Sequence, residues 1–419
     1  MCERANGGLF LKRRLMKKTF VLDVAPESWS SVPDAFRKPC PFPAAQKSAS
    51  IDFNGALLWM GKMSVPLKLP QWALASQWAK VRYYAAADIS KRLRLHPAIK
   101  ELDTHQTKVL SDDWGVGFSL QWLASSFQYK NVEHGFAAVQ DLQRKGAAKF
   151  LPKKKKSGPD KCPDFLAYDQ QNRVHVIECK GNQQGPNDFG RQFKRGREQK
   201  RNVEFTNESL VAQRLVTAFA FTGSESNWDS TLRVEDPLPE AENIYYRIET
   251  ESIEPIARSI DRIVAVRGLV LAGAYDAAAN AFPIETQMEG LRGTLLTGQE
   301  RFVAEDQEWV GQSYTLPFPR AITMDSELVV VGCRTRFGVA PAFSNALTKL
   351  KDRGDVLDSF LRETDLQLAL HTEVDDTMLE TPDAMLETPA EFMKIREEAR
   401  YASIRNGKIF ISDWELLTA

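Results

Sequence analysis

Cysteine is scarce in this 419-residue chain, and its few cysteines lie far apart. No two of them form a C-x-x-C pair; the five are Cys2, Cys40, Cys162, Cys179 and Cys333. This spacing argues against a disulfide-rich secreted scaffold and against a cysteine-based zinc or redox site. We therefore expect a reducing, intracellular compartment, the cytoplasm.

The chain also lacks a net charge and a long apolar run. Its 55 Lys and Arg residues balance 55 Asp and Glu residues, which argues against a uniformly basic coat for nucleic acid and against an acidic tail. The most apolar window, 263–282, contains Arg267 and Asp276, so too few uninterrupted apolar residues remain for a membrane span. The basic N-terminal segment has only a short apolar run, which includes Asp23, so a secretory signal is not expected.

What is present is a globular composition, with 43% hydrophobic and 26% charged residues. The chain is longer than one hydrophobic core usually grows, so we expect more than one domain. The order of elements predicts an N-terminal α+β region (1–105), a central α/β unit (106–225) and a C-terminal α+β domain (226–419) that recognises substrate or a partner.

Apolar periodicity and turn signals place the main elements. Strands are expected at 18–25, 162–169, 174–180, 210–221 and 326–337, and a hairpin around Asn406-Gly407. Helices are expected at 71–95, 111–127, 132–150, 187–203 and 254–273. For the second of these helices, Ser111, Asp112 or Asp113 is the expected cap.

The stretch KCPDFLAYDQQNRVHVIECKG, Lys161–Gly181, sets charged residues into two apolar strands. Side chains alternate along a strand, so Glu178 and Lys180 share one face while His175 and Cys179 lie on the other. The backbone alone therefore holds a carboxylate and an amine close together. We interpret His175 as a structural residue and the two cysteines of the stretch as packing residues.

The position of Asp164, on the preceding strand, depends on the register of the hairpin. A two-residue turn at 171–172 would pair Asp164 with Cys179, on the wrong face, whereas a three-residue loop at 170–172 pairs it with Glu178. Asn172 tolerates the left-handed conformation that such a loop needs at its last position. A functional site at this hairpin requires the three-residue loop.

Two carboxylates that converge at a strand edge suit Mg²⁺, which keeps several waters and binds one or two carboxylates together with phosphate oxygens. A neighbouring lysine can orient or help deprotonate a metal-bound water. Asp164, Glu178 and Lys180 therefore predict a site for phosphodiester hydrolysis.

The order Pro163-Asp164, thirteen intervening residues, then Glu178-Cys179-Lys180, resembles the PD-(D/E)XK nuclease superfamily. The resemblance covers about 120 residues. It implies an α/β, restriction-endonuclease-like core, in which a mixed central sheet is flanked by helices and its second and third strands carry the motif. It also implies that Asp164 and Glu178 bind Mg²⁺, for which Mn²⁺ can substitute, with the backbone carbonyl of Cys179 as a third ligand and Lys180 as the residue that orients water.

Many members of the superfamily carry a further acidic residue on the first helix, for which Asp112 and Asp113 are the candidates. Some members place a glutamine on the helix after the motif, and Gln192 and Gln199 match that place. The tyrosine that follows this glutamine four residues later in such members is missing here.

Six basic residues crowd the helix after the motif: Arg191, Lys194, Arg195, Arg197, Lys200 and Arg201. Beside a metal site they predict contacts with nucleic-acid phosphates; the alternative is an ordinary solvated helix face. The run Lys153–Lys156 is interpreted as a loop rather than as a second contact with nucleic acid.

These features predict a magnesium-dependent nuclease that acts on nucleic acid, DNA rather than RNA, in restriction or anti-phage defence, with a protein partner or a second copy of the chain as candidate partners. The alternatives are a repair nuclease for branched or single-stranded DNA, an RNA-cleaving toxin, and a catalytically silent nucleic-acid-binding module with the nuclease fold. In a last alternative the chain is an interaction protein and the motif is accidental.

Overall fold

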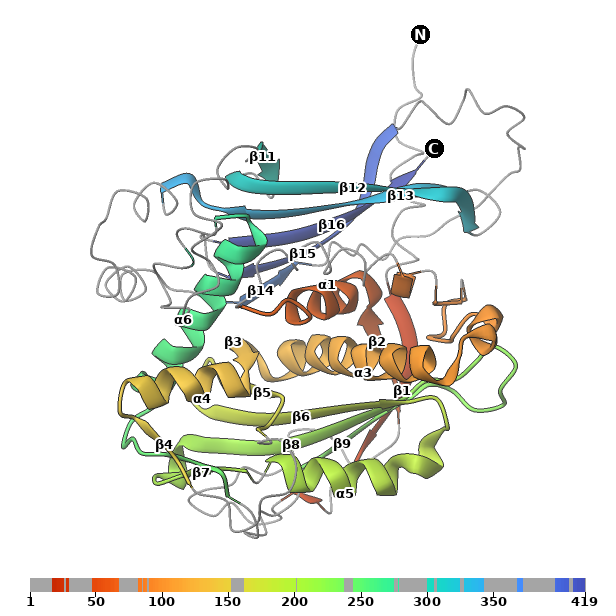
Figure 1. Cartoon of the computed structure of the whole chain (residues 1–419). Helices are drawn as coiled ribbons and strands as arrows, with labels where there is room; N and C mark the ends of the chain where they lie inside the picture. Colours follow the sequence, from red (N-terminus) through yellow and green to blue (C-terminus); the bar gives the residue numbers. More distant parts are fainter. Residues whose placement is uncertain are drawn as a thin grey trace.

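A mixed seven-stranded sheet, in the order β2-β1-β9-β8-β6-β5-β3, forms the centre of the computed structural model (Figure 1). The structure describes residues 17–25, 28–29, 47–67, 82–84, 86–88, 90–151, 162–200, 202–236, 244–274, 278, 300–304, 307–324, 328–342, 368–371, 396–406 and 410–418. The α/β class with a mixed central sheet flanked by helices, expected from the sequence, is confirmed.

The strands of this sheet come from distant parts of the chain. They are β1 (Lys17–Val24), β2 (Lys47–Asp52), β3 (Tyr129–His134), β5 (Phe165–Asp169), β6 (Val174–Asn182), β8 (Val211–Ala220) and β9 (Thr231–Glu235). The pairs β1–β9 and β6–β8 are parallel and the others are antiparallel. Both faces of β6 and β8 are covered, which explains why the two strands are apolar along nearly their whole length.

Helices cover both faces of the sheet. On one face, α1 (Phe53–Met63) and α3 (Thr104–Phe127) pack with strand residues such as Ile177 and Phe219 in the largest hydrophobic cluster. On the other face, α5 (Phe189–Lys200) buries Phe189 and Phe193 against β8. The other helices in the described part of the chain are α4 (Gly135–Arg144), α6 (Glu254–Leu271), and the short 3₁₀ turns η4 (Pro97–Glu101), η5 (Pro186–Asp188) and η6 (Glu208–Leu210).

Two further sheets complete the described fold. The smaller one, in the order β4-β10-β7, contains β4 (Ala148–Phe150), β10 (Tyr246–Ile248) and β7 (Val203–Phe205). The larger one, in the order β11-β12-β13-β16-β15-β14, contains β11 (Glu300–Ala304), β12 (Gln307–Met324), β13 (Leu328–Val339), β16 (Phe410–Thr418), β15 (Arg396–Asn406) and β14 (Leu368–His371). In Figure 1 this larger sheet and the central sheet lie on opposite sides of α1. The hairpin predicted around Asn406 is confirmed by the antiparallel pairing of β15 with β16, while residues 407–409 lie outside the described part.

The predicted domain boundaries need correction. The boundary at residue 105 falls in the first turn of α3, and the boundary at residue 225 separates β8 from β9, which are hydrogen-bonded neighbours. Because β1 and β2 also belong to the central sheet, all three predicted regions contribute to one sheet. Strand pairing between distant segments leaves no local mark in the sequence, so the order of elements alone suggested three separate units.

Two helix predictions also need correction. Asp103 caps α3 by accepting from the backbone N–H groups of His105 and Gln106, at 2.7 and 3.0 Å, so the helix begins well before the expected caps Ser111, Asp112 and Asp113. The helix expected at 132–150 is divided, because its first residues belong to β3 and its last to β4.

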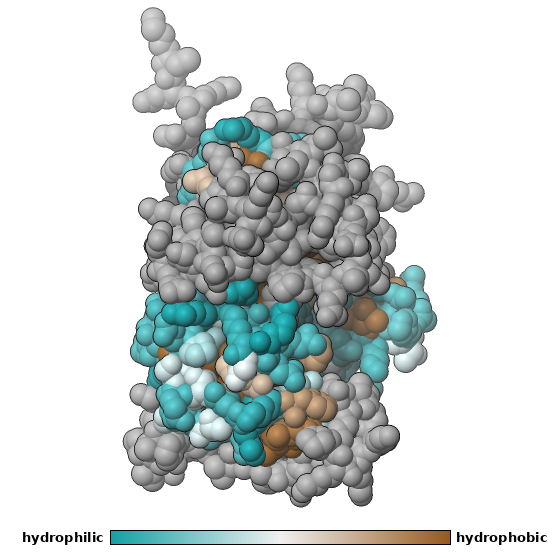
Figure 2. Space-filling view, turned by 60° about the vertical axis from the view of Figure 1, so that its left-hand side comes forward, coloured by the Kyte–Doolittle hydropathy of each residue, from teal (hydrophilic) through white to brown (hydrophobic). Residues whose placement is uncertain are grey.

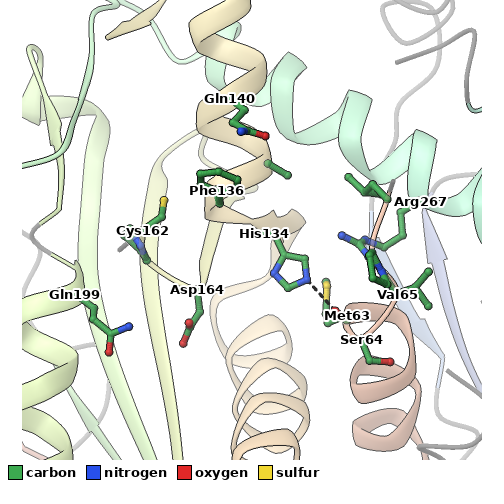
Figure 3. A pocket seen from close by; sticks show the side chains of 14 residues that line it. Met63, Ser64, Val65, His134, Phe136, Gln140, Cys162, Asp164, Gln199 and Arg267 are labelled. Carbon is green, nitrogen blue, oxygen red and sulfur yellow. Dashed lines mark hydrogen bonds between the residues drawn. The ribbon is translucent and has the colours of Figure 1, made fainter. Parts of the chain in front are cut away.

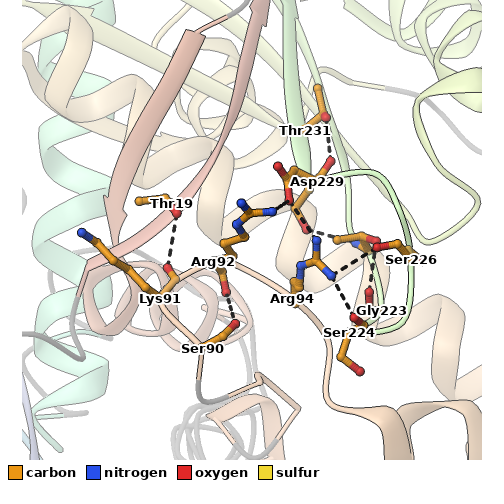
Figure 4. Close-up of polar contacts among 12 residues, drawn as sticks. Thr19, Ser90, Lys91, Arg92, Arg94, Gly223, Ser224, Ser226, Asp229 and Thr231 are labelled. Atoms are coloured by element: carbon orange, nitrogen blue, oxygen red, sulfur yellow. Dashed lines mark hydrogen bonds and ion pairs between the residues drawn. The ribbon is translucent and has the colours of Figure 1, made fainter.

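The helix expected at 71–95 does not extend to its predicted end. Arg92 and Leu95 instead form bridges with β1 and with Gly223. Figure 4 shows Arg92 and Arg94 converging on Asp229, each with a guanidinium nitrogen 3.0 Å from the same carboxylate oxygen. These long-range contacts outweigh the local preference for helix.

Arg267, in the apolar second half of α6, forms a buried ion pair. Arg267 is 1% exposed and donates to the carboxylate of Glu133 on β3 and to the backbone carbonyls of Lys62 and Val65. None of the described helices has the length and apolar character needed to cross a membrane. The face on which α4 and α6 lie is mainly hydrophilic where it is described, with smaller apolar patches (Figure 2).

Candidate active site

The hairpin that joins β5 to β6 has the register that a functional site requires. Phe165 pairs with Ile177 and Tyr168 with Val174, and the backbone N–H of Asp169 donates to the carbonyl of Arg173 at 3.0 Å. Residues 170–172 therefore form a three-residue loop, which carries Asp164 to the level of Glu178. Asn172 has a φ of 55°, as expected for the last position of this loop. The prediction of the register is confirmed.

The two faces of β6 also separate as predicted. Ile177 and Cys179 pack into the cluster beneath α3, and His175 is buried beside Tyr129 with its Nε2 3.1 Å from Asp169. Glu178 lies on the opposite face, beneath α5, where a Cβ on Gly196 would be 3.5 Å from its Cγ. His175 therefore has a structural role. Cys162 and Cys179 are free thiols; Cys179 is buried in the cluster beneath α3, as its interpretation as a packing residue requires, whereas Cys162 is only partly buried, against the cluster that contains Leu166.

The three candidate catalytic side chains converge at the start of β5. Lys180 forms an ion pair with Glu178 and has its Nζ 4.0 Å from Oδ2 of Asp164. The backbone N–H of Asp164 donates to Glu178 Oε2 at 3.1 Å, and the backbone N–H of Cys179 donates to Asp164 Oδ2 at 2.9 Å. Glu178 is fully buried, whereas the side chains of Asp164 and Lys180 are 31% and 21% exposed. The side chains of Asp164 and Lys180 are thus accessible from solvent.

Burial and mutual repulsion shift the charges of this group. Burial, reinforced by the Asp164 carboxylate, raises the pKa of Glu178 to about 8. Burial also raises the pKa of Asp164, and Lys180 opposes this shift. For Lys180 itself, burial lowers the pKa, but the two carboxylates outweigh it and raise the pKa. A cation bound between the carboxylates would offset the cost of ionising Glu178, so the site is suited to one.

The donor atoms fit a hard cation that keeps part of its water. The N–H of Cys179 points toward Asp164, and in a strand the carbonyl of the same residue points to the same side. Because the β5–β6 ladder begins with the pair of Phe165 and Ile177, this carbonyl lies beyond the end of the ladder and has no partner on β5. Within the described residues no cluster of three or more His, Cys, Asp or Glu side chains has the geometry of a metal site. The possible ligands are the carboxylates of Asp164 and Glu178 and the carbonyl of Cys179, which matches the small number of protein ligands that Mg²⁺ takes.

Helix α3 approaches β6 closely at two glycines. A Cβ on Gly181 would lie 1.8 Å from the carbonyl oxygen of Ser111, and a Cβ on Gly115 would lie 2.6 Å from the backbone nitrogen of Gly181. Only glycine permits this contact, which holds the middle of α3 against the end of the candidate site.

The two predicted acidic candidates on α3 differ in their surroundings. Burial raises the pKa of Asp112; the charges of Lys108 and Lys180 oppose this shift and Asp164 adds to it, so Asp112 lies within electrostatic range of the site. Asp113 instead accepts a hydrogen bond from the hydroxyl of Tyr83. Of the two acidic candidates, Asp112 is therefore the one whose charge is coupled to Asp164 and Lys180.

The two glutamines on α5 both lie close to the site. Gln192 donates from Nε2 to the carbonyl of Gly181 at 3.2 Å. Gln199 lines a cavity that Asp164 also lines. The missing tyrosine of the family pattern does not prevent either contact.

The basic face of α5 is only partly available for a ligand. Arg191, Lys194 and Arg195 are exposed, but Arg191 is paired with Asp188 at 2.8 Å. Arg197 is paired with Glu235 at 2.5 Å. The side chain of Lys200, all of Arg201 and the run Lys153–Lys156 lie outside the described part of the chain.

Sequence reasoning missed His134, at the end of β3. Its ring stacks on Phe165 at 5.1 Å, and its Nε2 lies 2.8 Å from the carbonyl oxygen of Met63, so Nε2 carries the proton. Burial lowers the pKa of His134, which leaves Nδ1 as an acceptor. Only the pairing of β3 with β5 brings this residue beside Asp164, and the sequence carries no local signal of it.

No protein-family model, curated protein or solved structure matches this chain.

Proposed function

We propose that the chain is a magnesium-dependent nuclease that hydrolyses phosphodiester bonds, in DNA rather than RNA, with a core of the restriction-endonuclease-like kind. The observation that carries the proposal is the convergence of Asp164, Glu178 and Lys180 on one face through a three-residue hairpin loop. An accidental motif has no need of this register. The setting in restriction or anti-phage defence rests on analogy with the superfamily.

Each of the three side chains has a distinct part in the proposed reaction. Asp164 and Glu178, with the carbonyl of Cys179, would hold Mg²⁺, which stabilises negative charge on the phosphate and on the leaving oxygen. Lys180 is near enough to both carboxylates to orient a water beside them. Because Glu178 is fully buried, bulk water does not surround its carboxylate.

The experiment that tests this proposal is a cleavage assay with the purified chain. Duplex DNA, single-stranded DNA and RNA are incubated with Mg²⁺, Mn²⁺ or EDTA. We expect the parent chain to cleave with metal and the Asp164→Ala and Lys180→Ala variants to lose cleavage, while the control Lys91→Ala, which removes an exposed lysine elsewhere, retains it. Cleavage that persists in both site variants and in EDTA would refute the site assignment. Binding without cleavage under any metal would favour the catalytically silent module.

A second measurement tests phosphate binding by α5. Each phosphate that a basic side chain neutralises contributes about 0.9 to the slope of log K against log salt for duplex DNA. Lys194 and Arg195 are exposed, whereas Arg197 is bound to Glu235, so we expect Lys194→Gln with Arg195→Gln to reduce the slope by about 2. An unchanged slope would move the phosphate contact to another surface.

A further inference from the structure

A cavity of about 690 Å³ adjoins the candidate site and shares one wall with it, the side chain of Asp164. We call it the Asp164 cavity. Figure 3 shows Asp164 between Gln199 of α5 on one side and the residues that follow α1, including Ser64 and Val65, on the other. The volume lies within the range of about 300–1,000 Å³ that is typical of small-molecule sites. A nucleotide joined to a phosphate at Asp164 would have its base within reach of this cavity.

The walls of the Asp164 cavity combine apolar surface with a few hydrogen-bonding groups. Met63, Val65, Phe136 and Pro163 supply apolar surface. Gln140 and Gln199 also line the cavity, and neither side-chain amide has a hydrogen-bond partner among the described residues. An amide both donates and accepts, so it can pair with the edges of different bases. The Nδ1 of His134 adds an acceptor.

Exposed aromatic rings continue from the rim of the cavity. The large hydrophobic side chains that the structure shows exposed are Phe136 (45%), Phe150 (42%) and Val303 (67%). Phe136 lines the cavity, and both phenylalanine rings contact the buried ring of Tyr246, at 6.5 and 5.6 Å between centroids. Exposed aromatic rings provide the surfaces on which bases of a single strand stack.

We propose that the chain acts on unpaired nucleotides: one base of a single strand enters the Asp164 cavity, and neighbouring bases stack on Phe136 and Phe150. This proposal rests on the nuclease function proposed above and names its substrate class. A base inside a duplex is stacked and paired, so it would enter the cavity only after extrusion, which costs energy that an unpaired base does not require. A single strand is therefore bound in preference to the same strand in a duplex.

The test is a binding measurement in EDTA, which needs no cleavage and can therefore succeed or fail independently of the nuclease proposal. A fluorescein-labelled DNA strand, alone or annealed to its complement, is titrated with the parent chain and with Phe136→Ala, Phe136→Leu, Phe150→Ala and Val303→Ala. Base stacking predicts that each phenylalanine-to-alanine change weakens single-strand binding by about 5- to 150-fold. Phe136→Leu keeps apolar volume but lacks a ring, so it should weaken binding as well, whereas Val303→Ala, the matched control, should not.

A second arm locates the base. The strands compared each lack a single base, at successive positions. With the parent chain, we expect removal of the base at one position to weaken binding more than removal at the neighbouring positions. With the double variant Gln140→Ala, Gln199→Ala, we expect removal at that position to weaken binding no more than removal at its neighbours. Circular dichroism verifies that each variant is folded. Equal affinity for duplex and single strand, together with parent-like binding by the phenylalanine variants, would overturn the proposal even if the chain cleaves DNA. Preferential single-strand binding that depends on Phe136 would support it even if no metal gives cleavage.

Discussion

Replacing Glu178 with glutamine tests the electrostatics of the site without any substrate. Glu178 is fully buried, and its pKa is about 8 in the folded chain against an ordinary value of 4.5. Between these two values the folded chain binds more protons than the unfolded chain, so the free energy of unfolding falls as the pH rises from 4.5 to 8. At about 1.4 kcal/mol for each pH unit crossed, the loss reaches about 5 kcal/mol by pH 8.

Glu178→Gln removes this titration and keeps an oxygen that can accept from the backbone N–H of Asp164. We expect the variant and the parent to have similar stability near pH 5, at the low end of this window, and the variant to be more stable by several kcal/mol at pH 8. The assay is urea denaturation in EDTA at intervals between these pH values. The matched control is Glu198→Gln on α5, which makes the same substitution at an exposed side chain.

Two outcomes bear on this reasoning. A difference between parent and Glu178→Gln that is the same near pH 5 as at pH 8 would refute it, because Glu178 would then be ionised in the folded chain throughout, held by Lys180. If Asp164 and Glu178 hold Mg²⁺, added Mg²⁺ should stabilise the parent at pH 8 and stabilise Glu178→Gln much less.

Three further predictions concern the framework of the site. Gly181→Ala should lower the free energy of unfolding by about 1–3 kcal/mol in the same denaturation assay, because its Cβ would lie 1.8 Å from a carbonyl oxygen of α3. The control is Gly190→Ala, whose Cβ would meet no atom within 4 Å. It should leave the free energy of unfolding unchanged or raise it by up to about 1 kcal/mol. Glu133→Gln should lower the free energy of unfolding by about 3–5 kcal/mol, because it leaves the charge of Arg267 buried and unpaired. The double variant Glu133→Leu, Arg267→Met should recover much of that loss. Equal stability of the single and double variants would contradict the pairing. Asn172→Ala should destabilise the chain by about 1–2 kcal/mol and Asn172→Gly by less, as judged by thermal melts, because the φ of 55° suits glycine and asparagine; an alanine variant as stable as the glycine variant would argue against this loop conformation.

Local patterns predicted the parts of the fold in which neighbours in sequence are neighbours in space. The strands β5, β6 and β8 and the helix α6 follow from their apolar runs. Strand alternation places Glu178 and Lys180 on one face, and the loop that ends at Asn172 sets the level of Asp164. These relations involve only a hairpin, so a short stretch of sequence contains all the information they need.

Relations between distant segments could not be predicted in this way. The sequence offers no reason to prefer Asp112 to Asp113. In the structure the two residues have different surroundings, because the Gly115–Gly181 contact holds α3 against the site and Asp113 accepts from the Tyr83 hydroxyl. Likewise, the basic residues of α5 looked equivalent, yet Arg197 is paired with Glu235 on a strand that the predicted boundaries assigned to another domain.

The sequence by itself determined the three charged side chains, their alternation and the turn that brings them together, because these depend on backbone geometry over a few residues. Only the tertiary structure decided that β1 and β9 join the same sheet, that His134 lies beside Asp164, and that a cavity opens between α4, α5 and the end of α1. These features arise where segments far apart in the chain pack together. The sequence of any one segment therefore does not predict the strand order, the position of His134 or the cavity.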